Sequence, residues 1–575
     1  MAALHLLLRD TYRFGFMVLE NEVEAMVPTP EVGIEPPKKT ARVGFDSSLS
    51  RIPQSSTCYL LLLPTELVLA ILSYLSPIDV VAVSVTCCTL HTHATTDLLW
   101  QGFIQDNVPG QKITKPYPCP NFRALYQAHD TRWCLPRYKI WVSDKDLTGR
   151  LVIIRFDQRR GCIEGYQLVA FSKQRAMQPW EAEPSIRIHS FEPEVYLHLD
   201  KPILELHAVS SQETNAIYRE RVMTRLIRAM RDGQYALIND EPVAGFPAYM
   251  LPETQPAVGR FEAEVPMNMF GPNSATFCSY MPARALSPVE LQSQATGSFP
   301  YGNVWPPPTI PASEYFMGAG PRARGHGDEP LFRAEHRPTR RSEVSELAFH
   351  TRKFLTHPFP IIAREENNTD TPSPAANSSG TNSGPSVPPR SNRAIYIPFH
   401  EVTTYATLDP KLYTPTKDKP FRGIWVGDYS GHGCEFLLMT QPDNDEETQL
   451  ESPKSKEGET DEDYEKRKYE QRIYRGSLEA IKLTGDPNIP RGELTFRVDD
   501  LGPEAYVRTI QDEPFKGARV VKSMGHIADN GFQHDQFIES QLFILSHDRL
   551  AQYWIEWGHI SYFERVNIDD FLVPR

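Results

Sequence analysis

A glycine-rich stretch, Gly423–Glu435, is the part of the sequence whose residues could hold a phosphate group. It contains Gly427, Gly431 and Gly433, and the backbone N–H groups of such loops can point at phosphate oxygens. A phosphate loop also requires a Lys-Ser or Lys-Thr pair at the start of a helix. No such pair follows here, and the flanking residues are typical of strands. The stretch therefore predicts a β-hairpin with glycines at tight turns rather than a nucleotide site.

Four histidines near the C-terminus could ligate a metal, but their spacing argues against it. His526, His534, His547 and His559 are separated by 8, 13 and 12 residues, whereas a helical ligand pair needs histidines one turn apart. The sequence also has no G-x-S-x-G nucleophile elbow and no C-x-x-C pair among its cysteines. We therefore expect no catalytic residue, no metal and no cofactor.

Length, charge and cysteine content narrow the class of protein further. A chain of 575 residues is long enough for two to four domains. Its net charge of −13 disfavours nucleic acid and anionic membrane as partners, because both need clustered Lys and Arg. Cysteines without disulfide or zinc spacing favour a reducing compartment, and no apolar run reaches the length of a membrane span. We expect a cytoplasmic and/or nuclear protein that binds neither nucleic acid nor membrane.

Residues 58–104 predict short helices with more apolar surface than they can bury among themselves. Pro64 suits the first position of a helix, where its missing N–H costs nothing. Leu67, Ile71 and Leu75 then recur at intervals of four residues and form one apolar stripe.

A second helix is predicted over residues 80–90, with Asp79 as its N-cap, and Leu98-Leu99-Trp100 lies beyond it. Physical reasoning leaves two possibilities open at this point. The block could pack as a helical subdomain on the rest of the chain, or it could present its stripe to another protein.

The order of residues in this block resembles the F-box pattern along its whole length. In that family the block docks onto a Skp-type adaptor through an apolar helix-to-helix interface, and the adaptor connects it to a cullin–RING ubiquitin ligase. The resemblance is carried by Leu63-Pro64, Glu66-Leu67, Ile71, Tyr74-Leu75, Asp79, Cys87 and Leu98-Leu99-Trp100. It implies that seven residues face the adaptor or hold the helices in place: Leu63, Pro64, Leu67, Ile71, Leu75, Cys87 and Trp100.

Outside this block the sequence changes from helical to strand-like. Residues 105–140 are predicted to be a linker, and residues 141–575 a β-rich substrate-recognition domain whose runs alternate polar and apolar side chains. Residues 1–57 predict a mobile leader, and insertions at about 365–393 and 441–466 are too polar to offset the entropy of ordering. The expected fold class is α+β, a small N-terminal helical F-box followed by a large, mainly antiparallel, barrel-like β domain with long disordered insertions.

Two stretches of the β-rich domain, Gly423–Glu435 and Lys482–Gly492, resemble the C-terminal domain of the F-box only protein 31 family. Trp305–Ala312 resembles a third element of that family. In the family this domain is a β-barrel-like unit that recruits substrates, including through short C-terminal segments. The resemblance implies a recognition surface near Trp425, Tyr429, His432 and Glu435, with Asp486 and Asn488 as second candidates. Each of these residues could equally belong to a turn or to the core.

These patterns favour a substrate-recognition subunit of a Skp–cullin–F-box ubiquitin ligase. Such a subunit holds a target protein near the ubiquitin-charged enzyme and itself has no reacting group. The alternative is an F-box-containing scaffold that binds proteins without ubiquitination. An enzyme that uses the β unit as a small-molecule barrel is a third possibility, and no constellation of side chains in the sequence supports it.

Overall fold

The computed structural model describes residues 58–143, 148–172, 176–208, 265–267, 277–285, 338–360, 394–429, 432–442 and 458–574. The predicted leader, the predicted insertion at 365–393 and the Trp305–Ala312 element lie outside the described residues. The chain divides into two units, Met1–Leu62 and Leu63–Arg575. In the first unit the description covers residues 58–62, where Tyr59–Leu62 forms the short 3₁₀ helix η1.

The second unit opens with four short helices. Helix α2 begins after Pro64, and Cys87 Sγ accepts the N–H of Leu90 at the start of α4. Ser76 caps α3 by accepting the N–H of Asp79, because an extended serine before a proline at the first helical position satisfies an otherwise unpaired donor. The four helices are α2 (Thr65–Leu72), α3 (Pro77–Ser84), α4 (Cys88–Ala94) and α5 (Asp97–Asn107). The prediction of one helix over residues 80–90 capped by Asp79 is therefore wrong.

Residues 105–140, predicted as a linker, are folded instead. They contain the end of α5 and two further helices, α6 (Phe122–Ala128) and α7 (Cys134–Tyr138). Phe122 and Leu125 of α6 are buried in the same apolar core as Trp100. Apolar side chains that recur at helical spacing across this stretch give it enough buried surface to order.

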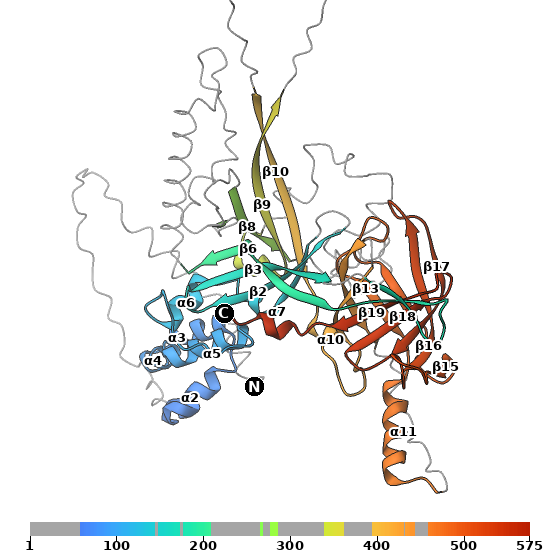
Figure 1. The fold of residues 1–575 in the computed structure, drawn as a ribbon. Coiled ribbons are helices and arrows are strands. Elements are labelled where there is room, and N and C mark those ends of the chain that lie inside the picture. The colour runs from blue at the N-terminus through green and yellow to red at the C-terminus, as the bar shows by residue number, and fades with distance from the viewer. Residues whose placement is uncertain are drawn as a thin grey trace, which may run out of the picture. The chain divides into compact units, whose positions relative to one another are not determined.

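An antiparallel sheet follows, which we call the central sheet. Its strands lie in the order β6-β3-β2-β1-β10-β9-β8-β7, and Figure 1 shows β9 and β10 as a long paired ribbon. Its strands are β1 (Ile140–Ser143), β2 (Arg150–Asp157), β3 (Cys162–Ser172), β6 (Pro193–His207), β7 (Val265–Met267), β8 (Phe277–Arg284), β9 (Val344–Pro360) and β10 (Ala394–Thr407).

Eight further strands close into an antiparallel barrel. They pair in the order β11-β12-β13-β14-β16-β17-β18-β19, and β19 pairs again with β11, so the ring has no free edge. The barrel strands are β11 (Gly423–Asp428), β12 (Cys434–Thr440), β13 (Leu478–Lys482), β14 (Leu494–Val498), β16 (Arg519–Asp529), β17 (Gln533–Ile544), β18 (Arg549–Trp554) and β19 (His559–Arg565).

Shorter elements complete the described fold. Strand β15 pairs with β16, while β5 adds to β19 in parallel and carries β4. The remaining elements are β4 (Met177–Pro179), β5 (Arg187–His189), β15 (Tyr506–Thr509), η6 (Arg341–Glu343), α10 (Pro410–Tyr413), α11 (Asp461–Ile473) and η9 (Ile568–Phe571). None of the helices that the structure describes is both long and apolar enough to cross a membrane.

The central sheet packs against a different apolar core on each of its two faces. One face of the sheet, which includes Ile154 and Phe156, shares a core with the helices. The opposite face, which includes Ile153, shares a core with barrel residues such as Val426 and Ala551. The predicted α+β class, with a small helical block and a large antiparallel barrel, is confirmed.

The range predicted for the second disordered insertion, 441–466, is too long because it overlaps a helix. Helix α11 begins at Asp461, inside that range, and Thr460 caps it by accepting the N–H of Asp463. Acidic residues fill the first turn of the helix and Arg472 the last, which suits the helix dipole at both ends. A run of acidic side chains that suggests disorder is here also the start of a helix.

Candidate functional site

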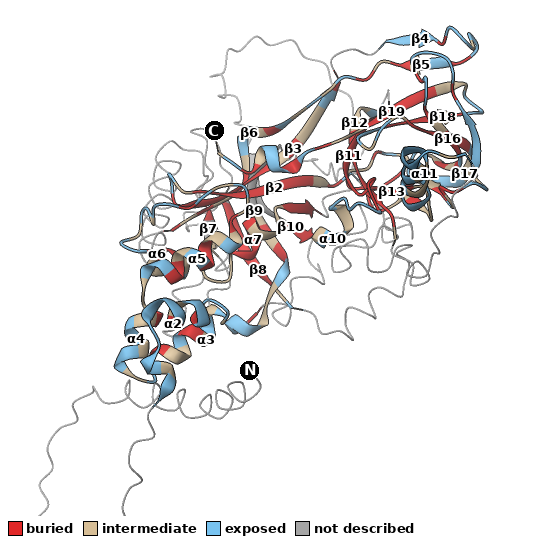
Figure 2. Ribbon diagram, turned by 90° about the horizontal axis from the view of Figure 1, so that it is seen from below, coloured by how far each residue is buried: buried red, intermediate tan, exposed pale blue. Residues whose placement is uncertain are grey.

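Helix α2 carries apolar side chains on two adjacent faces. Val68 and Leu72 are buried against the helical core, whereas Leu67 is 52% exposed and Ile71 lies beside it one turn on, also exposed. Figure 2 shows α2 and α4 largely in the colour of exposed residues. Val68 and Leu72 therefore pack α2 onto the helical core, while Leu67 and Ile71 keep much of their apolar surface accessible.

The exposed side continues along α3. Ile78, Val81 and Val85 follow at helical intervals and are exposed, as is Tyr74 between the helices. Exposed apolar side chains gathered on neighbouring helices are typical of a protein-binding surface. We call this set the docking face, which comprises Leu63, Leu67, Ile71, Tyr74, Ile78, Val81 and Val85.

The structure separates the seven predicted adaptor residues into two groups. Leu63, Pro64, Leu67 and Ile71 are exposed and available to a partner. The other three hold the helices together. Leu75 is partly buried against the helical core, Cys87 caps α4, and the indole N–H of buried Trp100 donates to the carbonyl of Ala94 over 2.8 Å.

In the barrel, strand register shows which residues line its inside. Residues directly opposite one another in paired strands share a face, and Trp425 pairs with Leu437, which pairs with Lys482. The alternate residues, such as Val426, belong to the core shared with the central sheet. Trp425 instead belongs to a separate core composed of barrel and adjoining residues. The face that carries Trp425, Leu437 and Lys482 is therefore the inner face.

Part of the inner face is charged. Lys482 Nζ lies 2.6 Å from Glu435 Oε2 and 2.5 Å from Asp486 Oδ2, and all three side chains are buried. The Lys482 ammonium also lies 4.6 Å from the ring centroid of Tyr429, and the Tyr429 hydroxyl is hydrogen-bonded to Thr495 Oγ1. We call these residues the lysine cluster.

The two carboxyl groups of the cluster differ in protonation. Burial raises the pKa of Glu435 to about 8, although Lys482 acts against this shift. Burial would also raise the pKa of Asp486, but the Lys482 charge and several hydrogen bonds lower it to about 2. Two backbone N–H groups, those of Asn488 and Ile489, donate to Asp486 Oδ1. At neutral pH the cluster therefore has one cation, one anion and one neutral carboxyl group that can donate a hydrogen bond.

A second polar group on the inner face contains no charge. The hydroxyls of Ser523 and Ser540 are hydrogen-bonded to each other, and Gln552 Nε2 donates to Ser540 Oγ. Gln552 Oε1 is buried and accepts no hydrogen bond from the described residues. Buried acceptors are nearly always paired with protein or with ordered water in folded proteins, so this oxygen can accept a hydrogen bond from a donor outside the described residues.

The predicted recognition residues do not form one surface. Trp425 is fully buried, and its indole N–H donates to the carbonyl of Phe421. His432 is exposed in the loop between β11 and β12, whereas half-buried Asn488 uses its side-chain amide to donate to the carbonyl of Ala528. The structure brings together Tyr429, Glu435 and Asp486, which share contacts with Lys482.

Sequence reasoning missed Lys482, the centre of the lysine cluster, and Gln552, which belongs to the uncharged polar group. In each case the sequence contains one sign of a buried polar residue. Lys482 interrupts the apolar run Ala480–Leu483, and Gln552 follows Leu550-Ala551 in a strand. A polar residue inside an apolar strand is informative because burying it requires partners.

Two protein-family models match the chain, and together they cover the helical block and the barrel. One is described as F-box-like and matches residues 60–105. This match includes α2 to α4 and most of α5, and supports an F-box protein. The other is described as a cyclin D1 binding domain and matches residues 405–570. It begins near the end of β10 and includes all eight strands of the barrel.

Three plant proteins are similar to part of the chain. Protein EXECUTER 2, chloroplastic, of Arabidopsis thaliana is 28% identical over 145 residues, which is 25% of this chain and 20% of that protein. The protein of the same name in Oryza sativa subsp. japonica is 28% identical over 128 residues, or 22% of this chain and 17% of that protein. Protein EXECUTER 1, chloroplastic, of Arabidopsis thaliana is 30% identical over 101 residues. The chain thus spans a fifth or less of the length of these curated relatives.

Proposed function

We propose that this chain is a substrate-recognition subunit of a Skp–cullin–F-box ubiquitin ligase, in the branch of the F-box only protein 31 family. The observation that carries the proposal is the docking face. It lies within the residues that match the F-box-like model, and its side chains are exposed although they are large and apolar. An adaptor with an apolar helical groove would remove this surface from water, which is a favourable process.

In this proposal the barrel receives the target protein. The second family model is described as binding cyclin D1, which makes a protein the expected partner of residues 405–570. The inner face offers a buried unpaired acceptor at Gln552 and a neutral carboxyl group at Glu435, which is hydrogen-bonded to Asp486. Such groups suit the polar end of a short peptide segment, such as a C-terminus, better than an apolar side chain. The chain would contribute proximity rather than chemistry.

Co-purification of the full-length chain from cells tests the adaptor part of the proposal. The wild-type chain should recover a Skp-type adaptor and a cullin. The double substitution Leu63→Ala/Pro64→Ala should abolish recovery of both, because it removes exposed apolar surface without touching the helical core. Leu199→Ala, which truncates an exposed leucine of β6, is the matched control and should recover both normally. If the wild-type chain recovers neither protein, the ligase assignment fails.

The same double variant tests the barrel, because it should retain targets that it cannot pass to the ligase. Adding Gln552→Leu should reduce the recovery of these targets. Gln541→Leu is the matched control, since the same substitution on β17 lies on the outer face, opposite Tyr553. Equal recovery in both variants would exclude the inner face as the recognition site. If adaptor-bound chain recovers targets that never become ubiquitinated, the chain acts as a scaffold instead.

A further inference from the structure

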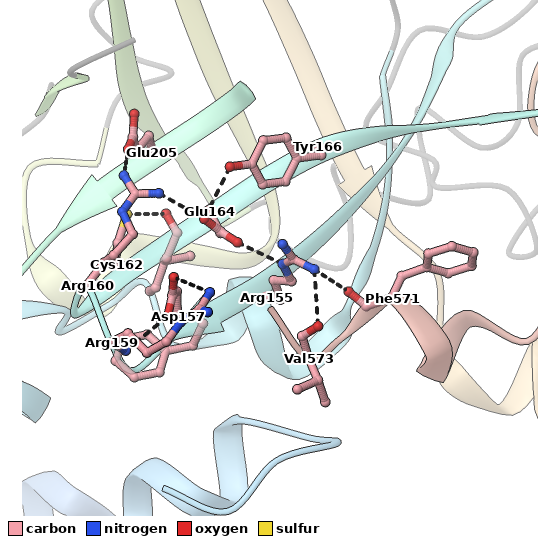
Figure 3. Close-up of polar contacts among 12 residues, drawn as sticks. Arg155, Asp157, Arg159, Arg160, Cys162, Glu164, Tyr166, Glu205, Phe571 and Val573 are labelled. Carbon is pink, nitrogen blue, oxygen red and sulfur yellow. Dashed lines mark hydrogen bonds and ion pairs between the residues drawn. The ribbon is translucent and has the colours of Figure 1, made fainter. Parts of the chain in front are cut away.

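One group of side chains on the central sheet combines the three ligand types that zinc prefers. Cys162 on β3 lies directly opposite His207 on the edge strand β6, and Glu205 lies two residues before His207 on the same face. One ligand atom from each residue lies within 4.8 Å of the other two. Figure 3 shows Cys162 and Glu205 beside the charged residues of β2 and β3.

Thiolate, imidazole and carboxylate together are a common ligand set for Zn²⁺, with bonds of about 2.0–2.3 Å. Ligand atoms around a tetrahedral zinc are therefore about 3.5 Å apart. The distances between the three ligand atoms are at most 4.8 Å, so they must shorten by roughly 1 Å or less when the ion binds. Rotation of the His207 and Glu205 side chains can supply this movement, because both residues are only partly buried. Among the described residues no other group has this composition and spacing.

We propose that Cys162, Glu205 and His207 bind a single Zn²⁺ ion, with water in the fourth position. The ion would cross-link β3 to the edge strand β6 at the end of the sheet where the β2–β3 hairpin turns. Nothing in the F-box or in the barrel is required for this site.

Arg160 is the competitor that the ion must displace. Its guanidinium contacts Glu205, but it also donates to Glu164 Oε2 over 3.2 Å. Glu164 is in turn held by Arg155 and the Tyr166 hydroxyl, as Figure 3 shows. Arg160 is 42% exposed, so it can give up Glu205 and keep Glu164 as its partner.

Two of the three ligand atoms already converge beside β3. His207 Nε2 lies 3.3 Å from Glu205 Oε1, close to the separation that two ligands of one tetrahedral ion require. The Cys162 thiol is fully buried and would bind the ion as a thiolate, so one proton would be released for each ion bound.

Titration of the full-length chain with Co²⁺, a spectroscopic substitute for Zn²⁺, tests the proposal. Binding should produce a thiolate-to-cobalt charge-transfer band that saturates at one ion per chain and disappears when Zn²⁺ is added. Cys162→Ser should abolish the band, and His207→Ala should weaken binding by at least about tenfold. The control is Cys134→Ser, because Cys134 is also a buried free thiol but belongs to no group of three potential ligands among the described residues. This variant should keep the band.

Arg160→Ala supplies a second test that does not alter a ligand. It frees Glu205, so the variant should bind Co²⁺ more tightly than the wild-type chain. Thermal melts without metal will show whether each variant is folded, and Zn²⁺ should raise the melting temperature of the wild-type chain but not of Cys162→Ser. The proposal is overturned if the folded wild-type chain gives no charge-transfer band, or if Cys162→Ser keeps it.

Discussion

Lys482 Nζ and Glu435 Oε2 lie 2.6 Å apart on the inner face of the barrel, where both side chains are buried. The two residues lie on β13 and β12, forty-seven residues apart in sequence. Asp486 Oδ2 lies 2.5 Å from the same ammonium group and forms the buried ion pair with Lys482. A lysine ammonium is costly to bury unless it is paired and hydrogen-bonded, so this contact depends on both carboxyl groups.

Removing the lysine should strongly destabilise the barrel. Lys482→Met keeps the length of the side chain but leaves Asp486 charged and buried, and breaking a buried pair in this way costs about 3–5 kcal/mol. Urea unfolding followed by intrinsic fluorescence would measure the loss. Lys468→Met is the matched control, because its pair with Glu465 is largely exposed and should contribute less than about 1 kcal/mol. Equal stability of the two variants would contradict the buried pair.

The raised pKa of Glu435 predicts that the free energy of unfolding decreases as the pH rises. Its pKa increases from 4.5 in the unfolded chain to about 8 in the folded protein, so the folded state retains a proton that the unfolded state releases. The contribution of this group is therefore complete below about pH 4.5 and is lost as the pH rises through about 8.

Comparison with Glu435→Gln isolates this effect from other titrating groups. The difference in free energy of unfolding between the wild-type chain and this variant should change between pH 5 and pH 9, roughly the interval between the two pKa values. The wild-type chain should lose stability relative to the variant as the pH increases. A difference that is constant over this interval would show that Glu435 is ionised in the folded protein.

Substitution of two leucines on α2 should separate adaptor binding from stability. Leu67→Ala removes an exposed side chain and should leave stability within about 0.5 kcal/mol of wild type, while it weakens adaptor binding. Leu72→Ala empties a buried site and should cost about 2–5 kcal/mol. Thermal melts and co-purification of the adaptor would separate the two effects. A large loss of stability in Leu67→Ala would mean that the docking face is covered by the chain itself.

Gly525 leaves space for an aromatic ring inside the barrel. A Cβ atom at this position would overlap the ring of Trp554 and lie 3.0 Å from Gln552 Nε2. Gly525→Ala should therefore destabilise the protein by about 1–3 kcal/mol. Gly102→Ala is the control, because a Cβ there meets no atom within 4 Å in helix α5, and it should be neutral or stabilising by up to about 1 kcal/mol. The two melting temperatures provide the comparison.

Local patterns in the sequence were sufficient to predict the F-box block and the fold class. Leu67 and Ile71 repeat with the period of a helix, and Pro64 marks its start, so neighbouring residues alone specify α2. The predicted stripe does not extend to Leu75, because α2 ends at Leu72 and Leu75 packs against the helical core. The start of α3 differs from the prediction because Ser76 and Asp79 both favour the cap position and Ser76 takes it. The break between α3 and α4 is not visible in the sequence, because its cap is Cys87, a residue type outside the usual set of N-caps.

The candidate sites depend on contacts between residues far apart in the chain. Trp425 was predicted on a recognition surface but is buried, since closure of β11 on β19 turns its face inward. The register of β12 with β13 places Glu435 beside Lys482, and the register of β3 with β6 places Cys162 opposite His207. Side-chain period is a local property that a sequence displays directly, whereas register and ring closure arise from pairing between distant strands. The helices and strands could therefore be predicted from the sequence, whereas the sites that they form required the tertiary structure.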